Sequence, residues 1–103
     1  MNYSQVIDLL ENYGCTFRNS NNCYVYYNDY VIFLLSYPNT FIVPKLVFDN
    51  KYNIFHSTAS YYTKNITFTM LEEFNEITTN QIKKLKSMIN QKKIFELEKD
   101  FYD

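Results

Sequence analysis

The sequence contains very little glycine, alanine or arginine, with one residue of each among 103. Phosphate-binding loops need several glycines, because backbone N–H groups must approach the phosphate without a Cβ in the way. The one glycine, Gly14, follows a helical pattern, and we expect it to end that helix. The composition therefore argues against the common nucleotide-binding motifs, and we expect no cofactor.

Metal ligands and catalytic groups are also scarce. Cys15 and Cys23 lie eight residues apart, and His56 is the only histidine, so the spacing of a zinc site is missing. In a reducing compartment the two cysteines should be buried free thiols, with a disulfide across a hairpin as the alternative. Most carboxylates lie at expected turns or helix ends. We therefore expect no metal site, no catalytic residues and no enzymatic activity.

Long apolar segments are missing as well. The longest apolar run, residues 30–35, has the length of a strand, and residues 1–5 do not resemble a secretion signal. We expect a cytoplasmic protein, either of the producing cell or of an infected host, that does not interact with membranes. The net charge of −1 provides no overall field that would select nucleic acid.

Aromatic residues and asparagine are abundant instead: 11 tyrosines, 9 phenylalanines and 13 asparagines. Large rings bury much apolar area each, so even a short chain can build a stable core from them. The bias toward Asn, Lys, Ile, Tyr and Phe is typical of AT-rich codons. It indicates a low-GC bacterium, a phage or a large DNA virus as the source.

The first half of the chain predicts a helix followed by strands. Apolar residues recur at helical spacing up to Tyr13, with Asn2 or Ser4 as the N-cap. Residues 15–18, 23–27 and 30–35 predict strands. Asn28 and Asp29 predict a tight hairpin turn, because both tolerate positive φ. The run 30–35 is apolar throughout, so it should be a central strand covered on both faces.

The middle of the chain predicts further strands. Residues 41–48 contain Pro44, which indicates an edge strand or a bend, because proline donates no ladder hydrogen bond. We expect strands at 52–56 and 61–70, separated by a loop at 57–60. In the second of these, alternation would place Ile66, Phe68 and Met70 on one face.

The last third predicts helices. A short helix is expected at 71–77, followed by a longer one capped by Thr78 or Thr79. Its apolar stripe consists of Ile82, Leu85, Met88 and Ile89. A second stripe, rotated by roughly 100°, consists of Ile94, Leu97 and Phe101. Because lysines 92 and 93 would otherwise lie on the apolar face, we expect a break near residues 90–93.

This order of elements predicts an α+β fold. A short N-terminal helix precedes an antiparallel meander sheet of about four to six strands, and a C-terminal helix or helix pair packs on one face. We expect one domain over residues 1–103. The acidic tail at 96–103 should be either mobile or docked on a partner.

Two surfaces are candidates for binding. Tyrosines cluster on the expected strands, and exposed tyrosine is enriched at protein interfaces. The proposed partner-binding residues on the uncovered sheet face are Tyr24, Tyr26, Tyr61 and Tyr62. Lysines cluster on the last helix without an intervening acid, which suits contacts with phosphates. The residues of this alternative nucleic-acid site are Lys83, Lys84, Lys86 and Lys93.

The sequence favours a small non-enzymatic module that binds a protein partner and occludes its surface. The indicated source suggests a phage- or virus-encoded antagonist of a host system, of which anti-CRISPR proteins are one class. The first alternative is a nucleic-acid-binding module that uses the helix at 83–93. A further alternative is a self-associating structural protein, with a homodimer formed through the strand that contains Pro44 or through the tail helix.

Overall fold

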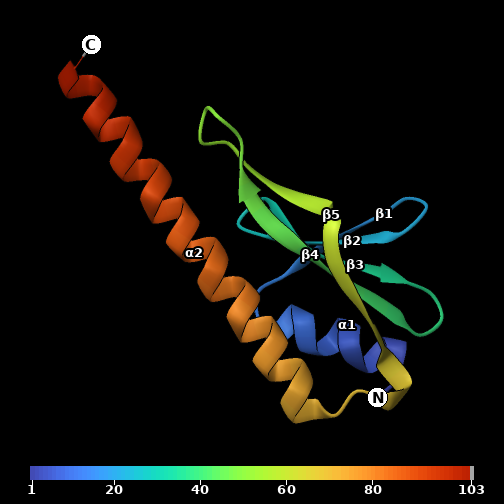
Figure 1. Cartoon of the computed structure of the whole chain (residues 1–103). Coiled ribbons are helices and arrows are strands. Elements are labelled where there is room, and N and C mark those ends of the chain that lie inside the picture. The colour runs from blue at the N-terminus through green and yellow to red at the C-terminus, as the bar shows by residue number, and fades with distance from the viewer. Residues whose placement is uncertain (103) are drawn as a thin grey trace.

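The computed structural model describes the backbone of residues 1–102 and the side chains of residues 1–99. Its architecture is the predicted α+β fold: helix α1 (Tyr3–Asn12), a five-stranded antiparallel sheet, and helix α2 (Leu71–Tyr102) (Figure 1). The sheet order β1-β2-β3-β4-β5 follows the chain, as in a meander. The remaining elements are β1 (Thr16–Asn19), β2 (Cys23–Tyr27), β3 (Tyr30–Ser36), β4 (Thr40–Phe48), β5 (Ile54–Asn65) and the 3-10 helix η1 (Ile66–Phe68).

The N-terminal helix has the predicted caps. The Asn2 side chain accepts a hydrogen bond from the Gln5 backbone N–H, and the Gln5 side chain accepts one from Asn2. This capping box satisfies two backbone donors that the first turn leaves unpaired. Gly14 follows α1 with φ of 90°, a conformation that disfavours any residue with a Cβ.

The predicted hairpin between β2 and β3 is also present. Asn28 and Asp29 have φ of 49° and 67°, which is the left-handed region that a two-residue hairpin turn requires. Strand β3 lies in the centre of the sheet, and four consecutive residues from Ile32 to Leu35 are buried. Successive strand residues point to opposite faces, so both faces of β3 are covered, as its apolar sequence predicts.

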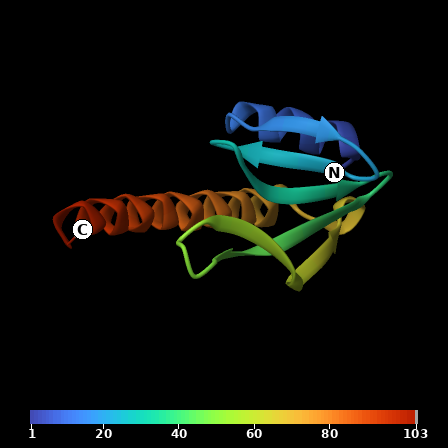
Figure 2. The same cartoon turned by 90° about the horizontal axis from the view of Figure 1, so that it is seen from above.

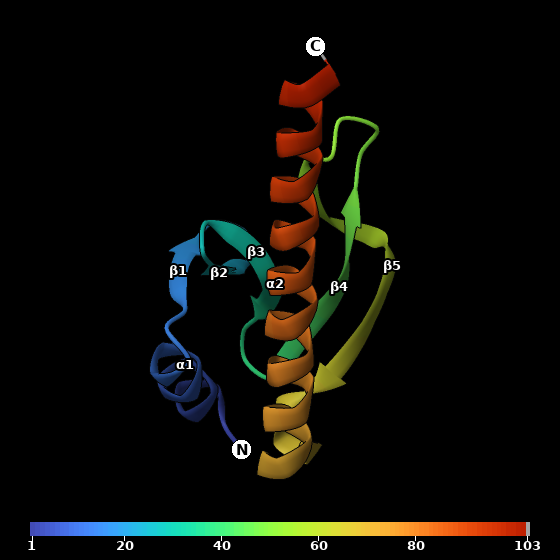
Figure 3. The same ribbon diagram turned by 90° about the vertical axis from the view of Figure 1, so that its left-hand side faces the viewer.

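The main core lies between the sheet and the two helices. Phe41 on β4 is fully buried, and its ring packs edge-to-face against Phe33 on β3 and Phe74 on α2, at centroid distances of 6.1 and 5.8 Å. The Tyr13 hydroxyl donates to the Asn75 side chain at 2.9 Å and thereby connects the end of α1 to α2. Figure 3 shows α2 crossing the strands beside α1.

Proline 44 bends its strand and does not mark an edge. Strand β4 pairs with both β3 and β5, so the edge-strand alternative is wrong and the bend is correct. The β4–β5 register shifts between Pro44 and Lys45, whose partners are Tyr61 and Ser57. The three extra residues of β5, at 58–60, form a bulge. The predicted loop at 57–60 is therefore part of one 12-residue strand.

The end of β5 differs from the sequence prediction. The strand stops at Asn65, whose side chain accepts a hydrogen bond from the Thr67 backbone N–H and caps η1. The predicted alternation over residues 61–70 is wrong because the chain turns here. Ile66 is fully buried, whereas Phe68 and Met70 are exposed.

The C-terminal helices are one continuous helix, without the predicted break at 90–93. Thr78 is no cap: its buried hydroxyl donates to the Phe74 carbonyl within the helix. The helix needs no break because Ile94 and Leu97 of the second stripe remain exposed, whereas Phe95 stacks on the Tyr52 ring between β4 and β5 at a centroid distance of 4.2 Å. The end of the helix projects from the body (Figure 2). The molecule accordingly measures 51 × 24 × 21 Å. The predicted acidic tail continues α2 as far as Tyr102, and the side chain of Phe101 lies outside the described residues.

Candidate functional site

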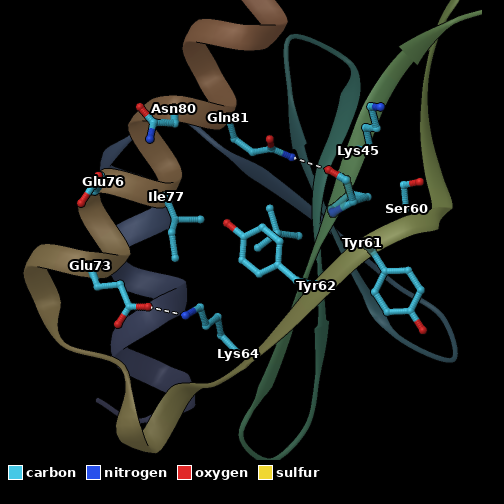
Figure 4. A pocket seen from close by; sticks show the side chains of 12 residues that line it. Lys45, Ser60, Tyr61, Tyr62, Lys64, Glu73, Glu76, Ile77, Asn80 and Gln81 are labelled. Atoms are coloured by element: carbon cyan, nitrogen blue, oxygen red, sulfur yellow. Dashed lines mark hydrogen bonds and ion pairs between the residues drawn. The ribbon is translucent and has the colours of Figure 1, made fainter.

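An open groove lies between the first half of α2 and strands β4 and β5 (Figure 4). It has a volume of about 770 Å³. We call it the β5–α2 groove. Its lining residues are Val43, Pro44, Lys45, Ser60, Tyr61, Tyr62, Lys64, Glu73, Glu76, Ile77, Asn80 and Gln81.

Gln81 fixes the position of α2 at this groove. The ladder between β3 and β4 pairs residues 34–36 with residues 40–42. Gln81 contacts the two strands beyond the end of this ladder. There the Gln81 Nε2 donates to the carbonyls of Ile32 and Pro44, at 2.9 and 3.0 Å. The amide donates to one carbonyl on each strand, so it joins the helix to both strands.

An ion pair forms the lower end of the groove. The Lys64 Nζ lies 2.6 Å from the Glu73 carboxylate, and this partner raises the pKa of Lys64. The same Nζ lies 6.0 Å from the centroid of the Tyr62 ring. Within residues 1–99, neither Lys45 nor Glu76 has an ion-pair partner. The groove therefore offers one unneutralised charge of each sign to a bound molecule.

Tyr61 and Tyr62 flank the groove on β5. They are 53% and 48% exposed, and they point in opposite directions (Figure 4). The Tyr62 ring points toward Ile77 and Gln81 on α2, whereas the Tyr61 ring points away from the helix. Tyr62 is therefore not on the uncovered sheet face, contrary to expectation, because adjacent strand residues alternate between faces.

The other two candidate tyrosines are on β2. Tyr24 pairs with Leu34, which pairs with Ile42, which in turn pairs with Thr63. Paired residues share a face, so Tyr24 lies on the same face as Thr63 and Tyr61 but three strands away. Tyr24 is half-buried against His56, with ring centroids 6.3 Å apart, and Tyr26 is half-buried as well. Because Tyr62 points to the opposite side of β5 from Tyr61, the four tyrosines do not share one face of the sheet.

The candidate lysines are all exposed: Lys83, Lys84, Lys86 and Lys93. The Lys86 Nζ lies 5.8 Å from the centroid of the Tyr27 ring. At 100° per residue, Lys86 and Lys93 lie close in direction, whereas Lys84 points roughly 160° away from Lys86. No acidic residue pairs with these four lysines within the described side chains.

An apolar patch at the start of α2 was missed by the sequence analysis. Phe68 is 81% exposed, and Met70 and Leu71 beside it are exposed as well. The sequence here alternates like a half-buried strand, so no local signal distinguished this segment from one. The capping role of the Asn65 side chain would have been the only indication of a turn.

Burial disfavours the charged forms of the two thiols and of the histidine. Cys15 and Cys23 are free and buried, and burial raises the pKa of Cys15 to about 11. Burial lowers the pKa of His56. No three histidine, cysteine or carboxylate residues among those described lie together in a way that could hold a metal ion.

The part of the chain that the structure describes has no helix with both the length and the apolar character needed to cross a membrane. No protein-family model matches the chain, and no significant match was found among the curated proteins or the solved structures.

Proposed function

We propose that this chain is a protein-binding module that accepts an extended segment of a partner protein along β5 and the β5–α2 groove. The observation that carries the proposal is a 12-residue edge strand with two adjacent, half-exposed tyrosines beside an open groove. Edge strands present unpaired backbone groups that an incoming strand can use, a mode known as β-augmentation.

The two tyrosines suit this mode because their rings lie on opposite faces of β5. An added strand also alternates its side chains, so it would place residues against both rings at once. Tyrosine provides large contact area at low entropic cost, which is typical of interface anchors. The bulge at residues 58–60 disrupts the edge, so the pairing segment is residues 61–65.

The groove adds polar selectivity to this surface. Lys45 and Glu76 lie on its strand side and its helix side, respectively, and both can pair with charges of the bound segment. A mixed-charge segment with an apolar or aromatic residue opposite Tyr62 is the expected ligand. The composition, which is typical of AT-rich codons, leads us to propose further that such occlusion serves a phage or virus against its host.

The test is affinity capture from lysate of the source's host with nuclease present, followed by mapping the bound segment of the recovered protein with overlapping peptides. Tyr61→Ala and Tyr62→Ala should each weaken binding of that peptide by about 30-fold, which corresponds to about 2 kcal/mol at an anchor. Tyr37→Ala is the matched control, because Tyr37 is exposed but lies on the β3–β4 turn. Unchanged affinity in both tyrosine variants, with folding intact, would contradict the proposal.

Nucleic-acid binding remains the second candidate, favoured by the exposed lysines of α2 that lack acidic partners among the described residues. Its signature would be binding to DNA or RNA that falls steeply with salt, because counterions are released from the phosphates. Recovery of the partner only without nuclease would favour this candidate over the first.

A further inference from the structure

The projecting half of α2 exposes a second apolar stripe. Ile94 and Leu97 are 55% and 60% exposed and lie three residues apart, so they share one side of the helix. Ile94 follows the buried Leu85 by nine residues, and this spacing turns its direction by about 180° from the core. The stripe therefore points away from the sheet. At one flank, Ile94 and Glu98 line a hollow beside Tyr52, whose ring stacks on that of Phe95 at a centroid distance of 4.2 Å.

We propose that this stripe pairs with the same stripe of a second copy of the chain, in a short parallel two-stranded coiled coil. In heptad terms Ile94 occupies position a and Leu97 position d, the combination that favours parallel dimers. Phe101 is the next a position in the sequence. Because the stripe points away from the sheet, the two bodies would lie on the outer sides of the helix pair.

Charges beside the stripe favour this partner and this orientation. Lys93 occupies the g position before Ile94, and Glu98 occupies the following e position. In a parallel pair, g of one helix faces the e five residues later on the other, so Lys93 would meet Glu98 of the second copy twice by symmetry. In an antiparallel pair, g faces g and e faces e, and these two contacts are lost.

The predicted dimer is weak because the interface is short. Seam residues before the stripe are polar, with Asn90 at d and Ser87 at a, so the apolar seam covers only about one heptad, from the a position of Ile94 to the next a position. Interfaces of this size fall in the transient class. We expect a dissociation constant on the order of 100 μM.

Sedimentation equilibrium between about 10 μM and 1 mM tests the association. The average mass should rise from 12.5 kDa toward twice that value, and Leu97→Lys should hold the chain at the monomer mass. Leu97 is exposed, so this variant should remain folded. A monomer mass at every concentration, or a dimer that Leu97→Lys does not dissociate, would overturn the proposal.

Charge reversal tests the pairing. Lys93→Glu and Glu98→Lys should each weaken the dimer by about tenfold, because two attractive contacts become repulsive, and the double variant should restore the affinity. Lys99→Glu is the matched control: it makes the same charge change at position f, opposite the stripe. Failure of the double variant to restore the dimer would refute the Lys93–Glu98 pairing.

Cross-linking tests the orientation. Ile94→Cys should give a disulfide-linked dimer under mild oxidation, because a positions meet each other in a parallel pair. The native thiols are buried, so they should not contribute. A chain that forms no covalent dimer would contradict the parallel arrangement. The stripe is separate from the β5–α2 groove, so Tyr62→Ala should leave the mass unchanged, and each proposal can fail without the other.

Discussion

Replacing Gln81 with leucine should weaken the attachment of α2 to strands β3 and β4. The Gln81 amide donates to the Ile32 and Pro44 carbonyls, at 2.9 and 3.0 Å. Each such hydrogen bond contributes about 0.5–1.5 kcal/mol net, and leucine leaves both acceptors without this donor. Because Gln81 is only partly buried, water can replace part of the loss. We expect a loss of about 2 kcal/mol in the free energy of unfolding.

Urea denaturation followed by circular dichroism measures this loss, and thermal unfolding should show a Tm lower by about 8 °C or more. Asn80→Ala is the matched control, because Asn80 lines the same groove on the adjacent helix position but is exposed. It should change stability by less than about 0.5 kcal/mol. Equal stability of wild type and Gln81→Leu would show that the amide does not fix the helix.

The Gln81→Glu variant tests the direction in which stability should change with pH. A carboxylate here would face two carbonyl oxygens, which disfavours its charged form and raises its pKa in the folded state. A raised folded-state pKa means that stability is retained at low pH and lost as pH rises above the unfolded value of about 4.3. The difference from wild type should therefore be larger at pH 7 than at pH 4. An opposite trend would contradict the hydrogen-bond geometry.

Three further outcomes are expected. The two native thiols should react slowly with a disulfide reagent at pH 8, because both are buried and burial raises the pKa of Cys15 to about 11. Rapid labelling of the folded protein would show that the thiols are not buried. Hydrogen bonds from Asn53 and Lys51 lower the pKa of Asp49, so Asp49→Ala should be less stable than wild type above pH 4. The stability difference should shrink as pH falls through the folded-state pKa of Asp49, and a pH-independent difference would exclude this contribution. A variant with glutamine in place of Lys83, Lys84 and Lys86 should stay folded and keep its protein partner. If the wild type instead binds nucleic acid with a log–log salt slope of roughly two to four, and the variant loses this binding, the nucleic-acid candidate would be favoured.

Local chemistry explains which parts of the fold could be predicted. Gly14 and the Asn28–Asp29 pair occupy backbone conformations that few residues adopt, so their identities specify a helix end and a hairpin turn. The apolar run at 30–35 specified the central strand for a similar reason, since only a strand covered on both faces suits it. These features depend on residues close in sequence.

The wrong predictions concern features that depend on distant residues. Polar residues at 57–60 read as a loop, yet the register shift opposite Pro44 accommodates them as a strand bulge. Lysines at 92 and 93 indicated a helix break, but the helix continues past them. Lys93 is exposed, and the Phe95 ring stacks on Tyr52, a contact with a residue 43 positions earlier. Ring directions at Tyr61 and Tyr62 depended on pleat phase, which the bulge at 58–60 resets.

The sequence by itself determined the α+β class, the caps of α1, the hairpin and the large number of aromatic side chains, because each follows from composition, local conformational preference or hydrophobic period. Only the tertiary structure decided which tyrosines flank a groove, which strand forms an open edge, and which side of α2 remains uncovered. Those outcomes require strand order, register and helix placement. Contacts such as Gln81 with β3 and β4 set them, between residues up to 49 positions apart.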